Sequence, residues 1–246
     1  MLKIENWEVL GWEHAIRGMR NPMNSWEKSD SNFFDDSEGH VCNICQGRGP
    51  MSLIEIGPND YTLMKNLRNA GTDHRKFMRM ITVYLDITAP LYWWKEFDTY
   101  RVGVEKNSCS TMHKIHAKEF TLEDFSCEHL LEQKDVNLPD NSCCNWDWEG
   151  CGIIAPIDIL EETVNMLNTA RKMFLETKDK KYWWQMIQLL PTSYNQKRTV
   201  MLNYEVLANI YKSRRNHKLD EWHTLCDWIE ELPYSELITG KEYDVE

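Results

Sequence analysis

The 246-residue chain has neither an excess of positive charge nor a long apolar segment. Its 28 Lys and Arg residues face 39 Asp and Glu residues, giving a net charge of −11, so no basic face is available for nucleic acid polymers. No apolar run approaches the roughly 20 residues that a membrane-spanning helix needs, and the first ten residues lack a signal-peptide layout. We therefore expect a cytoplasmic protein that binds no nucleic acid polymer and no membrane.

Repeats, low-complexity linkers and short catalytic signatures are absent as well. The chain contains no dinucleotide-binding glycine fingerprint, no P-loop, no hydrolase nucleophile elbow and no His-Glu-x-x-His zinc motif. Without a repeat or linker, nothing divides the chain, and its 42% hydrophobic residues are enough for one sizeable core. A single domain over residues 1–246 is predicted, with an irregular insertion at about 25–58.

The eight cysteines do not indicate a disulfide framework, because the chain is neither short nor recognisably exported. Cys42 and Cys45 have the two-residue gap of a zinc-binding pair, and Cys143, Cys144 and Cys151 can supply further ligands. The later three do not form a second Cys-x-x-Cys pair, so free cysteines and no metal are the preferred interpretation. A zinc-stapled interaction protein remains an alternative.

Strand-forming residues are concentrated in the first half and helical periodicity in the second. The segment 77–88 is rich in β-branched and aromatic residues and predicts a buried strand, and 102–104 begins another extended segment. Capping residues, Pro and Gly mark helices at 59–70, 91–100, 121–131, 156–177, 179–190, 198–214 and 219–231. This order favours a mixed α+β domain with a helix-dominated C-terminal half.

Three polar segments are candidates for function, although each also has an ordinary structural interpretation. His74 follows a predicted helix and is either a surface residue or a cofactor ligand. The stretch 107–111, Asn-Ser-Cys-Ser-Thr, is either a turn or an anion-binding loop. Asn203 and Arg214 share a face of the predicted helix 198–214, where Arg214 and Arg215 either clamp a phosphate or favour the helix dipole.

Several of these stretches, in this order, resemble the flavin-dependent thymidylate synthases (ThyX). His74, followed by a strand and then by Ala89-Pro90, is similar to the layout around the family's flavin-site histidine. The family's Arg-His-Arg signature is represented by Thr99-Tyr100-Arg101. In the C-terminal half, Leu-Pro, Asn203-x-x-x-Leu-x-Asn209 and Arg214 match a second family block. The resemblance covers about residues 59–114 and 185–233, and weakly Arg17–Arg20.

The resemblance implies a ThyX-like fold with a mostly antiparallel central sheet, and a flavoenzyme that transfers a one-carbon unit to a pyrimidine deoxynucleotide (dUMP to dTMP or a close variant). FAD supplies the hydride, with NADPH and methylenetetrahydrofolate as co-substrates, and a homotetramer with shared active sites is expected. The implied FAD-binding residues are His74, Tyr100, Arg101, Asn203 and Asn209. The implied nucleotide-binding residues are Glu96, Asn107, Ser108, Cys109, Ser110, Gln188, Arg214 and Arg215, with Ser108, Cys109, Ser110 and Arg214 on the reactive side.

The chain also departs from the family's pattern, and each departure removes a cation. Thr99 and Tyr100 replace two signature residues, no Arg occurs near Thr111, and Gln188 stands where an Arg is expected. A lost charge-assisted phosphate contact costs about 1.5–3 kcal/mol, so compensation is needed, for which the candidates are Lys106, Lys197 and Arg198. The alternative is a divergent flavin- or nucleotide-binding protein without thymidylate synthase activity.

Overall fold

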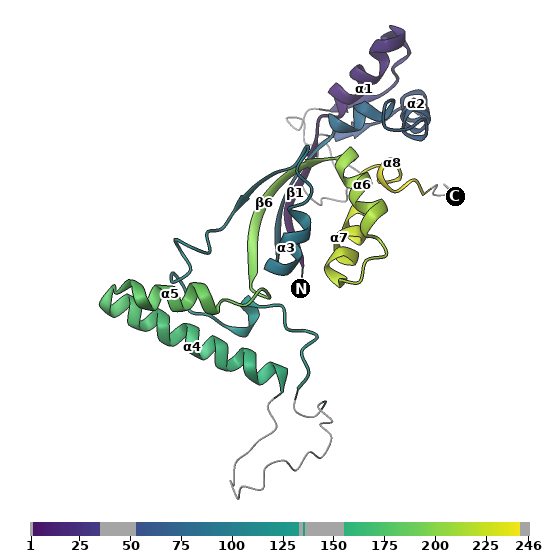
Figure 1. The fold of residues 1–246 in the computed structure, drawn as a ribbon. Coiled ribbons are helices and arrows are strands. Elements are labelled where there is room, and N and C mark those ends of the chain that lie inside the picture. Colours follow the sequence, from purple (N-terminus) through teal and green to yellow (C-terminus); the bar gives the residue numbers. More distant parts are fainter. Residues whose placement is uncertain (1, 35–52, 133–134, 136–154, 242–246) are drawn as a thin grey trace, which may run out of the picture. The chain divides into compact units, whose positions relative to one another are not determined.

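The computed structural model describes residues 2–34, 53–132, 135 and 155–241. The chain divides into two compact units (Figure 1). The larger unit contains Leu2–Thr88, Trp93–Ser108 and Lys197–Glu246, and the smaller one Ala89–Tyr92 and Cys109–Gln196. One domain over 1–246 stays a prediction. None of the described helices is long and apolar enough to cross a membrane.

A four-stranded sheet carries the order β1-β4-β6-β5. Its strands are β1 (Lys3–Leu10), β4 (Thr82–Pro90), β5 (Glu105–Ser108) and β6 (Asn195–Asn203), and the β1–β4 and β5–β6 pairs are antiparallel. Strand β4 alternates between two environments, because Val83, Leu85 and Ile87 are buried while Tyr84 is exposed. The predicted mixed α/β fold with a mostly antiparallel sheet is confirmed.

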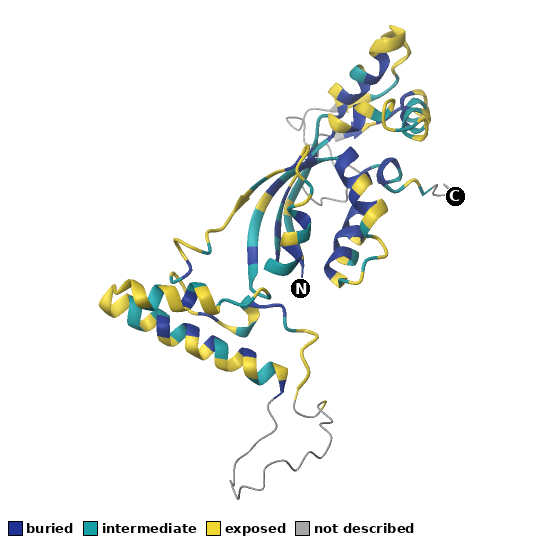
Figure 2. Cartoon of the chain, viewed as in Figure 1, coloured by how far each residue is buried: buried dark blue, intermediate teal, exposed yellow. Residues whose placement is uncertain are grey.

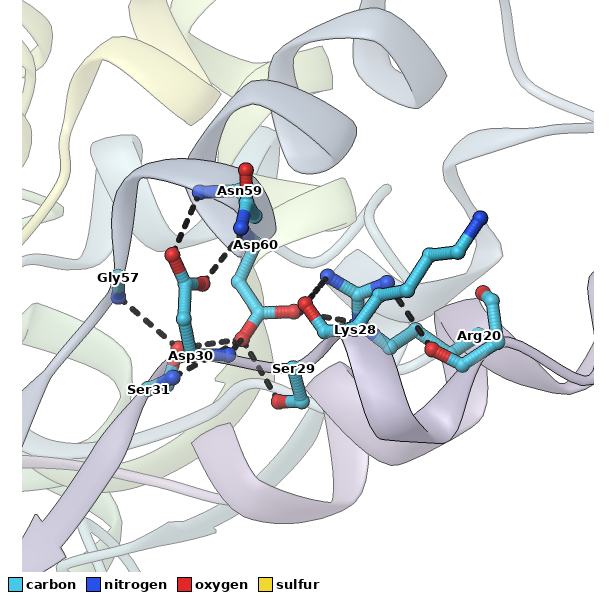
Figure 3. Close-up of polar contacts among 9 residues, drawn as sticks. Arg20, Lys28, Ser29, Asp30, Ser31, Gly57, Asn59 and Asp60 are labelled. Carbon is cyan, nitrogen blue, oxygen red and sulfur yellow. Dashed lines mark hydrogen bonds and ion pairs between the residues drawn. The ribbon is translucent and has the colours of Figure 1, made fainter.

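The N-terminal part of the larger unit contains α1 (Trp12–Arg20), the short strands β2 (Asn32–Phe34) and β3 (Leu53–Glu55), and α2 (Pro58–Asn69). Asn59 was expected to cap α2, but the helix begins one residue earlier, at Pro58. The Asp30 carboxylate accepts hydrogen bonds from the Asn59 and Asp60 amides at 2.9 and 3.1 Å (Figure 3). A distant side chain therefore satisfies the free amides that begin the helix.

The C-terminal part of the larger unit packs helices around aromatic side chains. These helices are α6 (Tyr204–Arg214), α7 (Asp220–Glu230) and the short α8 (Glu236–Thr239), together with most of α3 (Leu91–Phe97). Trp93 lies 4.9 Å from Trp94 and from Trp222, and 5.0 Å from Phe97, measured between ring centroids. Figure 2 shows the resulting burial along α6 and α7, so this aromatic cluster fixes α3 against α7.

Two predicted segments in this unit differ from the structure. Residues 75–79 form a 3₁₀ helix, η4 (Arg75–Arg79), so the strand predicted at 77–88 begins at Thr82 instead. The helix predicted at 198–214 is a strand up to Asn203, with α6 beginning at Tyr204. Thr199 and Val200 are β-branched, and Val200 is fully buried as an inward-facing strand residue. The extended segment predicted at 102–104 begins at Glu105.

The smaller unit is built on two helices, α4 (Pro156–Thr177) and α5 (Lys180–Leu189), as predicted. Its core contains Ile115, Phe120, Phe125, Leu167 and Met186. The helix predicted at 121–131 is only a 3₁₀ turn, η5 (Leu122–Asp124), although Thr121 and Asp124 form a capping box at its start.

Candidate functional site

A polar cluster in the larger unit contains three of the predicted site residues. The Arg214 guanidinium, at the end of α6, donates from Nε to the Tyr100 hydroxyl at 3.0 Å and from Nη1 to Glu96 Oε2 at 2.8 Å. Its Cζ also lies 4.6 Å from the Trp222 ring centroid. Glu96 and Tyr100 are 118 and 114 residues away from Arg214 in the sequence. The fold thus brings together two segments that only the family resemblance connected.

The Glu96 carboxylate is the common partner in this cluster. Besides Arg214, its Oε2 accepts a hydrogen bond from Trp222 Nε1 at 3.0 Å and lies 3.3 Å from His217 Nε2. His217 Nδ1 accepts the Leu219 amide at 3.2 Å, which leaves the imidazole proton of the neutral ring on Nε2, facing Glu96. Two hydrogen-bond donors and the His217 ring nitrogen thus converge on one carboxylate oxygen.

Arg214 keeps part of its hydrogen-bonding capacity. Its side chain is 19% exposed, and among the described residues Nη2 has no hydrogen-bond partner. A guanidinium held by its other nitrogens and stacked on an aromatic ring loses little conformational entropy when Nη2 binds an oxygen. Arg214 is therefore positioned to donate to an anion or a carbonyl.

Asn203 is the N-cap of α6 and has only its amide nitrogen available for a ligand. Its Oδ1 accepts the Val206 amide at 3.0 Å, as N-cap residues do. Its Nδ2 faces Gly103, where an added Cβ would come within 2.9 Å. Gly103 has a φ of +72°, a conformation that favours glycine. The expectation that Asn203 and Arg214 share a helix face is wrong, because Asn203 precedes the helix.

Two further predicted flavin residues, His74 and Asn209, lie near Arg75, the first residue of η4. His74 is exposed and immediately precedes η4, while Asn209 is exposed on α6. Arg75 Nη2 donates to Asn209 Oδ1 at 3.5 Å, and Arg75 Nε lies 2.8 Å from Glu205 Oε2 in a largely buried ion pair. Arg75 thus links η4 to α6.

The predicted nucleotide loop crosses the division between the two units. Asn107 and Ser108 end β5 in the larger unit, opposite Thr199 and Arg198 of β6. Cys109 and Ser110 belong to the smaller unit, where the Cys109 carbonyl accepts Gln196 Nε2 at 2.6 Å. Ser110 Oγ accepts the amides of residues 112 and 113, a turn-stabilising arrangement. Gln188 is exposed on α5 of the same unit.

The cations proposed to compensate for lost arginines already have carboxylate partners. Lys106 Nζ and Arg198 Nη1 both lie 2.9 Å from Asp98 Oδ1, and Lys197 Nζ lies 3.1 Å from Asp86 Oδ2. These ion pairs reduce what each side chain can offer to a phosphate.

The other two predicted arginines differ from each other. Arg215 pairs with Glu230 Oε1 at 2.5 Å, and Glu230 also binds Lys241. Arg101 is exposed and forms no ion pair within the described residues. Of the predicted cations, Arg101 thus keeps its charge open to a ligand, while Arg214 keeps one free nitrogen.

Sequence reasoning missed His217 and Trp222. Both contact Glu96 and neither was assigned a role, because a contact between α3 and the α6–α7 segment is tertiary. The proximity of His217 to Arg214 in sequence was the only available signal. His217 also lines an open pocket of about 490 Å³ whose other lining residues are Arg215, Asn216, His223, Cys226, Asp227 and Glu230.

The possible metal ligands Cys42, Cys45, Cys143, Cys144 and Cys151 lie outside the described residues. Within the described part of the chain, no three or more His, Cys, Asp or Glu side chains are grouped as a metal site.

Comparison with known proteins places the fold. No family model and no curated protein sequence matches the chain. Two structures of ThyX from Helicobacter pylori with FAD and dUMP are similar, with TM-scores of 0.61 and 0.59 at 15% and 16% identity. They cover 98% and 97% of this chain and 98% of their own chains.

A UMP/dUMP methylase, PolB from Streptomyces cacaoi, bound with 5-Br UMP is also similar, with a TM-score of 0.55 at 12% identity. The match covers 98% of this chain and 95% of that chain. The resemblance seen in the sequence is thereby confirmed at the level of the fold: the chain has the fold of the flavin-dependent thymidylate synthases.

Proposed function

We propose that the protein is a ThyX-like flavoenzyme that binds FAD and a pyrimidine deoxynucleotide and transfers a one-carbon unit to the base. The observation that carries this proposal is the meeting of Glu96, Tyr100 and Arg214 in a chain of ThyX fold. The family resemblance assigns all three residues to the ligand site. The structural neighbours were crystallised with FAD and dUMP, or with a brominated UMP, which supports the same ligand class.

Arg214 has the role of a nucleotide donor in this proposal. Its free Nη2 can bind a phosphate oxygen or a pyrimidine carbonyl, while Tyr100, Glu96 and Trp222 hold the rest of the guanidinium. A pre-oriented donor favours catalysis because it needs no reorganisation when charge develops on the base. Glu96 and Arg215 are bound mainly to other protein groups in the structure.

The residues present fit FAD as a ligand. The pyrophosphate and the ring carbonyls of FAD are acceptors, and the free Asn203 Nδ2, the exposed Arg101 and the exposed His74 are donors. Gly103 leaves room beside Asn203 that any side chain would fill. When bound, FAD supplies the hydride chemistry, with NADPH as reductant and methylenetetrahydrofolate as one-carbon donor in the proposed reaction. This chain's part is to bind and orient the ligands and to exclude water.

A second candidate is a flavin- or nucleotide-binding protein without turnover. The ion pairs of Lys106, Lys197 and Arg198 favour it, because these side chains no longer offer an unpaired charge in place of the missing family arginines. Both candidates predict that the ligands bind, but only the first predicts that the nucleotide is converted to product.

Purified protein separates the candidates. We expect bound flavin absorbance near 450 nm, roughly the value of any oxidised flavin. We also expect release of tritium from the 5-position of labelled dUMP when FAD, NADPH and methylenetetrahydrofolate are supplied. Flavin binding without tritium release selects the second candidate. Colourless protein that takes up no added FAD contradicts both.

A further inference from the structure

We infer that Glu96 is a positioning residue for Arg214 rather than a direct nucleotide contact, and that His217 and Trp222 hold Glu96 in place for this role. The inference rests on the proposed function and extends it to two residues that the resemblance did not assign. It replaces the nucleotide-binding role that the sequence suggested for Glu96.

The first argument is the saturation of Glu96 Oε2. This oxygen accepts hydrogen bonds from Arg214 Nη1 at 2.8 Å and Trp222 Nε1 at 3.0 Å, and it lies 3.3 Å from His217 Nε2. With two hydrogen bonds and the His217 ring nitrogen beside it, Glu96 Oε2 has little capacity left for a ligand, and only Oε1 is without a partner among the described residues. A negative charge facing a nucleotide phosphate would also repel it, whereas the same charge behind Arg214 orients the cation.

The second argument is that Glu96 is anchored independently of Arg214. Trp222 is completely buried and packs among Trp93 and Phe97, so its indole N–H is fixed in space. The His217 ring is fixed by the Leu219 amide at Nδ1 and by an edge contact with Trp222, 6.1 Å between ring centroids. Trp222 and His217 therefore fix the position of the Glu96 carboxylate. The carboxylate in turn fixes the orientation of the Arg214 guanidinium.

The third argument concerns the consequence for Arg214. With Nε on Tyr100 and Nη1 on Glu96, the guanidinium plane is defined by two hydrogen bonds, and Trp222 stacks on it. Nη2 is the part of the group left without a partner in the described residues. When the His217 or Trp222 contact is lost, Glu96 is held less firmly, and Arg214 Nη2 samples a wider range of orientations.

The decisive experiment measures dUMP affinity of the full chain by equilibrium dialysis with FAD present. Glu96→Ala and His217→Gly are each expected to raise the Kd about ten-fold, and the double variant no more than Glu96→Ala alone, because His217 acts through Glu96. Additive effects in the double variant overturn the inference, as does an unchanged Kd in His217→Gly. FAD retention is expected to be unchanged in all three variants.

Chemical rescue tests the contact between His217 and Glu96 itself. His217 is 25% exposed and lines the open 490 Å³ pocket, so a small ring can reach the space left by His217→Gly. Imidazole, which both accepts and donates, is expected to restore most of the lost affinity. The matched control is 1-methylimidazole, which fills the space but has no N–H; equal rescue by both molecules would show that only volume matters and would refute the positioning role.

Trp222→Phe removes the other donor and is compared with Trp228→Phe. Trp228 lies on the same helix, is buried, and its Nε1 has no hydrogen-bond partner within the described residues, so the control matches the loss of ring volume. Weaker dUMP binding in Trp222→Phe alone supports the inference, and equal effects of both variants contradict it.

An NMR readout separates this inference from the proposed function. Exchange of the Arg214 Nε–H with water is expected to be slow in the wild type and faster in His217→Gly and Glu96→Ala, with or without nucleotide. Unchanged exchange overturns the positioning role even if the wild type binds dUMP. A wild type that binds no dUMP but shows the exchange difference refutes the proposed nucleotide and leaves the positioning contact standing.

Discussion

Asp60 Oδ1 accepts a hydrogen bond from Arg20 Nε at 2.6 Å, and both side chains are almost completely buried. The other hydrogen-bonding atoms of the pair have partners as well. Asp60 Oδ2 accepts hydrogen bonds from the Ser29 and Ser31 hydroxyls, and Arg20 donates to the carbonyls of residues 25 and 28 (Figure 3). This fully satisfied pair connects α1 to α2.

The Arg20–Asp60 pair predicts a large loss of stability when one partner is removed. Asp60→Asn leaves the Arg20 charge buried without a counter-ion, for which about 3 kcal/mol of unfolding free energy is expected to be lost. Urea unfolding followed by circular dichroism measures it. Lys3→Met, which removes the exposed Lys3–Glu5 pair, is the control and should change stability by less than about 0.5 kcal/mol. Equal effects would contradict the role assigned to burial.

The sequence predicted those helices whose ends are marked by local signals such as a proline at the first turn. The helix over 156–177 begins with Pro156 and keeps its apolar spacing, and it was predicted with its exact limits. The segment 198–214 was misassigned because Asn203 both ends β6 and caps α6, so strand and helix join without a turn residue between them. The spacing of apolar residues alone does not show where such a strand ends and the helix begins.

For the site, the sequence supplied residues but not their partners. Arg214 and Tyr100 were selected through the family resemblance, and the structure brings them within hydrogen-bond distance. His217 and Trp222 carried no motif. Their contacts with Glu96 depend on the packing of α3 beside α7, which is set by aromatic side chains that are far apart in the sequence.

Gly103→Ala tests the space beside Asn203. The new Cβ would lie 2.9 Å from Asn203 Nδ2 and 3.3 Å from Val206 Cγ2, so the Asn203 amide must move, and weaker FAD retention is expected. Gly71→Ala is the matched control, because Gly71 also has a positive φ (+102°) but has nothing within 4 Å of the new Cβ. Both variants should lose about 1 kcal/mol of stability from backbone strain. Equal FAD retention in the two variants would refute a flavin role for Asn203.

Asp86 predicts an acid-dependent loss of stability. Hydrogen bonds from the Thr199 hydroxyl and the Asn6 amide, with Lys197 nearby, lower the pKa of Asp86 from 3.8 to about 2. Because the folded-state pKa lies below the unfolded value, the stabilisation is present above pH 3.8 and disappears as the pH falls to about 2.

Asp86→Asn is therefore expected to lower the unfolding free energy at pH 7 by about 1 kcal/mol, allowing for solvent screening. The difference from wild type should vanish near pH 2. Thr199→Val, which removes the largest contribution, should raise the Asp86 pKa toward its ordinary value, as measured by carboxyl ¹³C NMR. An unchanged Asp86 pKa in Thr199→Val would contradict the assigned cause.

Arg214 and Arg215 are adjacent, yet the structure predicts opposite sensitivities to substitution. Lysine in place of Arg214 keeps the charge, but its single nitrogen cannot contact both Tyr100 and Glu96 and also bind a ligand. The affinity for dUMP should therefore weaken by about ten-fold or more. Arg215→Lys keeps a cation beside Glu230, which Lys241 also contacts, and should leave dUMP affinity within about two-fold of wild type. Isothermal titration with dUMP in the presence of FAD compares the two variants directly. If Arg215→Lys proves the more damaging, the phosphate-binding role belongs to Arg215, and the cluster around Glu96 serves only to hold α6 in place.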